Sequence, residues 1–141
     1  DIEVLLDFNF EDKNFAYDLE TAFNENEILC HRAPSGKNSL RNIDILHDQM
    51  NKVNKLVFVY GHSSKDWVKE RVSAAIQKIA FDDSFTMEDI FIVVANPQNK
   101  PDDLGFNKHL TADINFFENS YNDKLSLELV DNILNNLTGN S

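Results

Sequence analysis

The sequence is poor in cysteine, glycine and basic residues. Its one cysteine, Cys30, has no partner for an internal disulfide, which fits a reducing cytoplasm. With four glycines, the chain has neither a Gly-x-Gly-x-x-Gly fingerprint nor a Gly-Lys-Ser/Thr phosphate loop. Acidic residues outnumber basic ones by 24 to 13, and the net charge of −11 disfavours binding to nucleic acid or to an anionic membrane. The given sequence contains no apolar run long enough to span a bilayer and no signal-peptide pattern, and a region lost before Asp1 could have carried either.

Metal-binding and nucleophile motifs are also missing. The four histidines (His31, His47, His62 and His109) do not occur at paired metal-ligand spacings. No serine or cysteine lies in a nucleophile-elbow sequence. The sequence therefore predicts no metal ion and no resident cofactor.

The composition is that of one globular domain covering residues 1–141. Hydrophobic residues make up 42% of the chain, and eleven phenylalanines are available for a core. The chain starts at Asp1 and not at methionine, so we expect it to be a piece of a longer multidomain protein.

Short apolar segments alternate with segments of helical periodicity. The expected strands are residues 2–8, 27–32, 55–60, 90–95 and a short one within 111–117, and the expected helices are residues 11–24, 39–53, 64–80 and 124–137. Residues 55–60 and 90–95 are almost uniformly apolar, which is typical of strands buried on both faces. The pattern predicts a three-layer α/β fold of flavodoxin-like type, with a five-stranded parallel sheet in the order 2-1-3-4-5 and helices on both faces.

In this topology the first and third strands meet at the switch point, where ligand sites form. The candidate site is the crevice between residues 7–11 and residues 61–65, which we call the switch-point crevice. A receiver domain of a response regulator has the same topology. It would need a phosphoacceptor Asp where this third strand ends in Tyr60-Gly61, and a Lys that is missing from the last strand, so we exclude that class.

An ordered combination of motifs resembles a TIR (Toll/interleukin-receptor-like) domain. The first strand is followed by Asn9-Phe-Glu-Asp-Lys-Asn-Phe15, and the third runs into Ser-x-x-Trp-x-x-Glu, ending at Glu70. More specifically, the chain resembles divergent bacterial TIR-like domains attached to large signal-transduction ATPases. Those domains share a strand ending in Tyr-Gly before a helix that begins with Trp, and a Phe-x-x-His segment matched by residues 106–109.

The resemblance implies a catalytic carboxylate. Active TIR domains cleave the bond between nicotinamide and ribose in NAD, and their catalytic Glu lies three residues after a Trp, which here is Glu70. Such a carboxylate stabilises the oxocarbenium-like ribose left behind. The residues expected to contact the NAD substrate are Phe8, Asn9, Arg32, Lys37, Ser63 and Trp67.

Simpler interpretations of the same residues stay open. Glu70 lies about 200° around its helix from Val68, so it also fits a solvated surface position. Trp67 is equally explained as a packing anchor on which Arg71 stacks. Arg32 and Lys37 also fit solvated charges in a loop.

Two classes of function follow from the resemblance. In the first, the chain is a bacterial immune or stress effector that hydrolyses NAD once self-association completes the site with a neighbour's loop after the second strand. In the second, it is a non-enzymatic interaction module that contacts other TIR domains, or the rest of its parent protein, through that loop and the last helix. A nucleotide sensor without turnover is a third hypothesis. An open cavity beside Phe8, Asn9 and Glu70 would favour the enzyme, and a filled crevice would favour the module.

Overall fold

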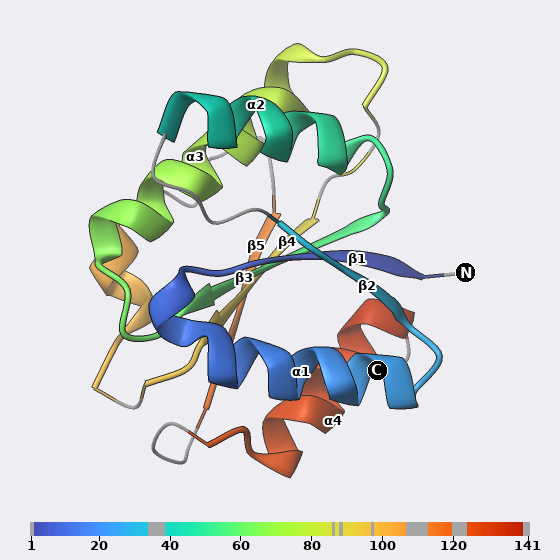
Figure 1. The fold of residues 1–141 in the computed structure, drawn as a ribbon, viewed down its shortest axis with the longest axis vertical. Helices are drawn as coiled ribbons and strands as arrows, with labels where there is room; N and C mark the ends of the chain where they lie inside the picture. Colours follow the sequence, from blue (N-terminus) through green and yellow to red (C-terminus); the bar gives the residue numbers. More distant parts are fainter. Residues whose placement is uncertain are drawn as a thin grey trace.

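The computed structural model shows a five-stranded parallel sheet in the order β2-β1-β3-β4-β5, with helices on both faces (Figure 1). This confirms the predicted fold class. The structure describes residues 2–33, 39–85, 87, 89–96, 98–106, 113–119 and 124–139, with the backbone alone for residues 39–42. The strands are β1 (Glu3–Asp7), β2 (Leu29–Arg32), β3 (Lys55–Tyr60), β4 (Asp89–Val94) and β5 (Asp113–Glu118).

The helices form two layers. They are α1 (Lys13–Glu25), α2 (Ser39–Met50), α3 (Lys65–Phe81) and α4 (Leu127–Thr138), with short 3₁₀ turns at Phe10–Asp12 and Pro101–Leu104. Figure 1 shows α1 and α4 on one side of the sheet and α2 and α3 on the other. The described helices include none with the length and apolar character needed to cross a bilayer.

The side chains of each central strand pack into two separate hydrophobic cores, one on each face of the sheet. In β1, Val4 and Leu6 pack with the α1–α4 layer, and Leu5 packs with the α2–α3 layer. The same alternation in β3 and β4 requires apolar residues at nearly every position. The uniformly apolar runs in the sequence are therefore explained by burial on both faces.

Several element boundaries differ from the sequence prediction by one to three residues; α2, for example, ends at Met50 and not at residue 53. β2 begins at Leu29 and not at Glu27, because Glu27 has a φ of 62° and turns the chain while the Ile28 N–H donates to the Phe23 carbonyl at 2.9 Å. α4 begins at Leu127, three residues later than predicted. Its cap is Ser126, whose hydroxyl accepts the Leu129 N–H at 3.1 Å.

Two leucines in the first turn of α4 offer a matched test of this packing. Leu129 is 2% exposed and Leu127 is 83% exposed. We expect Leu129→Ala to lower the free energy of unfolding by about 2–5 kcal/mol through lost burial and a new cavity. Leu127→Ala should change it by less than about 0.5 kcal/mol. Urea denaturation of both variants checks this, and similar effects would contradict the observed packing of α4.

Candidate functional site

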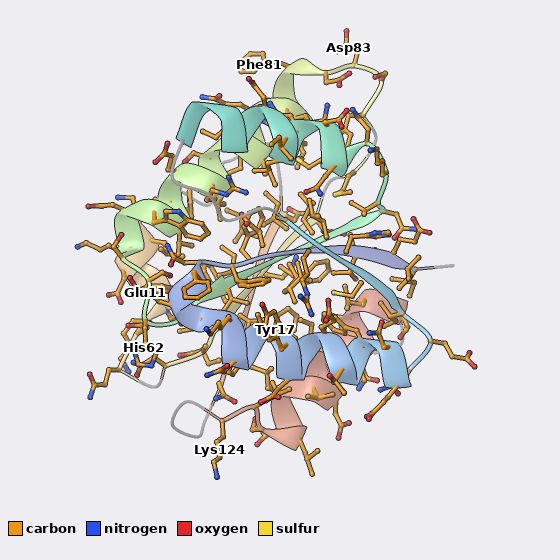
Figure 2. All side chains as sticks on the ribbon, in the orientation of Figure 1. Glu11, Tyr17, His62, Phe81, Asp83 and Lys124 are labelled. Carbon is orange, nitrogen blue, oxygen red and sulfur yellow. The ribbon has the colours of Figure 1, made fainter. Side chains whose placement is uncertain are left out.

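The loops after β1 and β3 meet at the switch point, as the topology predicts. The Asp12 carboxylate joins them, because its two oxygens accept the backbone N–H groups of His62 at 2.7 Å and Ser63 at 3.2 Å. Asp12 is 4% exposed, so its charge is held largely by these donors next to the start of α3. Figure 2 shows His62 at the same end of the molecule as Glu11, which precedes Asp12.

Glycine at position 61 is explained by the same contact. A Cβ atom there would lie 2.3 Å from the Asp12 Oδ1 atom, well inside van der Waals contact. The Gly61 carbonyl in turn accepts a hydrogen bond from the Asn99 side chain at 2.7 Å. The turn after β3 is therefore packed between the β1 loop and the segment that follows β4.

A buried ion pair lies beneath this turn. Arg71 of α3 donates to the Asp7 carboxylate at the end of β1 through Nε at 2.8 Å and Nη2 at 3.1 Å. Arg71 is 4% exposed and Asp7 is 1% exposed. Burial raises the pKa of Asp7, and the charge and hydrogen bonds of Arg71 lower it in part.

Arg71, and not Glu70, is turned towards the sheet. Glu70 is exposed and forms no side-chain hydrogen bond or ion pair with the described part of the chain. Glu70 lies about 200° around the helix from the buried Val68 and Val72, so it points away from the sheet. Sequence reasoning missed Arg71 as a site residue. The available signal was its place in the buried stripe of Val68, Val72 and Ala75, together with the charged Asp7 in an apolar strand.

Trp67 lies beside the ion pair, and Ser63 belongs to the turn that precedes α3. The Arg71 guanidinium is 5.5 Å from the centre of the Trp67 ring, as expected for stacking, and the half-buried ring packs against the α2–α3 core. Ser63 is 4% exposed, and its hydroxyl oxygen has no hydrogen-bond partner among the described residues.

Phe8 and Asn9 have structural contacts. Phe8 is 5% exposed and meets the Tyr17 ring edge-to-face, with the ring centres 5.9 Å apart. The Asn9 side chain accepts the Glu11 N–H at 3.1 Å and caps the 3₁₀ turn that carries Asp12. Packing and capping therefore account for both residues.

Arg32 is tied to α1. It donates to both oxygens of the Glu20 carboxylate, at 2.9 and 2.6 Å, and its guanidinium lies 4.1 Å from the centre of the Tyr17 ring. The hydrogen bond to Glu20 raises the pKa of Arg32, which stays charged. Lys37 lies outside the described residues.

The segment after β4 covers the end of β3. The Tyr60 hydroxyl donates to the Asp103 carboxylate at 3.0 Å, and burial together with this carboxylate raises the pKa of Tyr60 to about 12. The backbone N–H of Lys100 and the Tyr60 hydroxyl lower the pKa of Asp103, which is therefore ionised at neutral pH. Within the described ranges, no three His, Cys, Asp or Glu side chains cluster closely enough to hold a metal ion.

Comparisons with known proteins give no family assignment. No protein-family model matches the chain, and a search of curated proteins finds no match.

The contact between Asp12 and Gly61 predicts a strong coupling. We expect Gly61→Ala to cost about 1–3 kcal/mol of unfolding free energy, because the new methyl group overlaps the carboxylate. In an Asp12→Ala background this cost should largely disappear. Urea denaturation of the two single variants, the double variant and the parent chain measures the coupling energy, and additive costs would contradict the contact.

The buried ion pair predicts a specific pH dependence. In Arg71→Met the pKa of Asp7 should rise further, because the charge and the hydrogen bonds of Arg71 are lost and only the backbone hydrogen bond of Phe8 still lowers it. A raised folded-state pKa gives stability that is present below the unfolded value of 3.8 and is lost as pH rises through the folded value. Arg71→Met should therefore cost about 3–5 kcal/mol at pH 7 and less near pH 4.

Denaturant unfolding at a series of pH values, compared between variant and parent, tests this expectation. The double variant Asp7→Leu/Arg71→Met removes both charges and is the control. It should be close to the parent in stability at pH 7, with no comparable change in its deficit with pH. A deficit of Arg71→Met that grows on acidification would contradict the assignment.

Proposed function

We propose that this chain is a TIR-like interaction domain that does not itself turn over NAD. The observation that supports this most strongly is the occupied switch-point crevice. The Asp12 carboxylate takes up the N–H donors of His62 and Ser63, and Arg71 is committed to Asp7. The groups that would meet a dinucleotide phosphate at this point of the fold are thus used inside the protein.

Charge also supports a role without a dinucleotide. Asp12 and Asp103 lie in the loops around the carboxyl edge of β1 and β3, and the chain carries a net charge of −11. A pyrophosphate would be repelled by these two carboxylates, with little water to screen the buried Asp12. Arg32, the cation expected to meet it, is paired with Glu20.

The partners we propose are other copies of the domain and the remaining domains of a parent signalling protein. α4 begins with Leu127, a large apolar side chain that is 83% exposed. An exposed apolar residue at the start of this helix fits the contact surface that the resemblance implies for it. The loop after β2, the other expected contact, lies outside the described residues.

NAD hydrolysis after assembly is the second candidate, and one observation favours it. Within the described part of the chain, neither the buried Ser63 hydroxyl oxygen nor the exposed Glu70 carboxylate has a hydrogen-bond partner. In the family that the sequence resembles, a neighbour's loop completes the catalytic site. Assembly around these two groups is the route by which this chain would become active.

One experiment separates the candidates. The purified chain, with a histidine tag, is displayed at high density on nickel-chelating vesicles with NAD, and nucleotide loss is followed by chromatography. We expect no loss of NAD, and we expect that NAD does not raise the melting temperature of the protein. Sedimentation of the free chain at rising concentration should show self-association. Glu70→Ala is compared with Glu25→Ala, which removes an exposed carboxylate at the end of α1, away from the proposed contact helix.

Other results would contradict the proposal or support a different function. NAD loss that disappears in Glu70→Ala but persists in Glu25→Ala would overturn the proposal and establish the hydrolase. Thermal stabilisation by NAD without product would instead indicate a nucleotide sensor. A chain that remains monomeric at all concentrations and leaves NAD intact would refute self-association as its mode of interaction.

A further inference from the structure

The strand β2 forms one edge of the sheet, because β1 is its only neighbouring strand in the described part of the chain (Figure 1). Two hydrogen bonds identify its side towards β1. The N–H groups of Leu29 and Ala33 donate to carbonyls of the β1 segment at 3.2 and 2.9 Å. Backbone groups of successive residues point to opposite sides of a strand, so those of Cys30 and Arg32 point away from the sheet.

The outward backbone groups of β2 are almost entirely unpaired. Among the described residues, the N–H and carbonyl of Cys30 and the N–H of Arg32 have no hydrogen-bond partner. The Arg32 carbonyl lies 3.5 Å from the Nε2 atom of Gln49, and this long contact leaves the carbonyl able to accept another donor. The edge therefore offers two donors and two acceptors to an added strand.

The residues of β2 do not protect this edge. Its sequence, Leu-Cys-His-Arg, contains no carboxylate, lysine or proline, and Leu29 is 51% exposed. The charge of Arg32 is matched by the Glu20 carboxylate, 2.6 Å away. In a chain with a net charge of −11, an edge strand without acidic residues is a place where a second copy can approach with little repulsion.

The opposite edge of the sheet is less suited to a second copy. β5 carries exposed carboxylates at both of its ends, Asp113 and Glu118. An antiparallel pairing of β5 with another β5 brings Asp113 of one copy near Glu118 of the other, and like charges on facing strands are destabilising. Charge therefore favours β2 over β5 as a contact between copies.

We propose that β2 is the contact between two copies of this domain, which pair antiparallel about a two-fold axis. His31 lies at the axis and faces His31 of the second copy, so Cys30 of each copy faces Arg32 of the other. Each of these facing pairs exchanges two backbone hydrogen bonds, so all the outward groups of β2 are used. The two five-stranded sheets then join into one continuous sheet.

This contact rests on the self-association proposed for the domain and names the surface that carries it. A pairing through one short strand is small compared with the interfaces of stable dimers. Dilute chains are therefore expected to remain monomeric. Copies that are concentrated, or held together by a parent protein, associate through β2.

Amide hydrogen exchange tests the contact without any substitution. The full chain, labelled with ¹⁵N, is followed by NMR at low and high concentration, and sedimentation measures its association under both conditions. Once most of the chain is associated, the amides of Cys30 and Arg32 should exchange about tenfold or more slowly. The amides of Leu29 and Ala33 should change little, because they are already bonded to the β1 segment.

Cysteine cross-linking tests the register. In a Cys30→Ser background, His31→Cys places two thiols opposite each other where the Cα atoms lie about 4.5 Å apart, within reach of a disulfide. Leu29→Cys is the matched control, since it is exposed on the same face of β2 but lies about 13 Å along the strands from its counterpart. Under mild oxidation the dimer should form about tenfold or more faster with His31→Cys. Circular dichroism confirms that both variants are folded.

The outcomes separate this contact from self-association itself. Association seen by sedimentation, with unchanged exchange at Cys30 and Arg32, would overturn the pairing of β2 and leave the proposed function intact. Cross-linking of Leu29→Cys as fast as that of His31→Cys would do the same. Slow exchange of both amides in the monomer would show that another part of the chain covers this edge and would also overturn the proposal. A chain that stays monomeric and gives no specific cross-link would refute both proposals.

Discussion

The buried ion pair between Asp7 and Arg71 determines how α3 lies on the sheet. Both charges are almost completely removed from water, which is tolerable only when the two groups meet with good geometry. The pair therefore fixes the rotation of α3 about its axis. It places Trp67 against the guanidinium and leaves Glu70 in solvent. Because of this one constraint, Arg71 faces the switch point, whereas Glu70, the residue that the sequence motif emphasises, does not.

The carboxyl edge of the sheet is where side chains connect neighbouring loops by hydrogen bonds. Three side chains cross it: Asp12 binds the turn after β3, Asn99 binds the Gly61 carbonyl, and Asn119 accepts the Ser126 N–H at 3.0 Å and donates to the Lys124 carbonyl at 2.7 Å. Open α/β sheets usually leave such backbone groups for a ligand. Here they are paired internally, which suits a domain that presents a rigid surface.

The topology of the sheet could be predicted from the sequence, because strands that are buried on both faces are recognisable as uniformly apolar runs. Uniformly apolar runs marked β3 and β4 as central strands, and their alternation with helices predicted the order of the sheet. Boundaries were less predictable. Glu27 adopts a left-handed conformation in place of the expected strand, since a turn after α1 is needed before β2 can pair with β1. A turn of this kind cannot be predicted from the sequence pattern when the turn contains no glycine.

The sequence by itself determined which loops meet at the switch point and that α3 would place a tryptophan there. Only the tertiary structure decided which charges face inward. Asp12 and Arg71 look like ordinary charged residues along the chain, and each becomes a buried group because its partner comes from a distant segment. Helical periodicity fixes the relative angles of neighbouring side chains, but the absolute rotation of a helix is set by what it packs against. That rotation turned Arg71 towards β1 and Glu70 away from it.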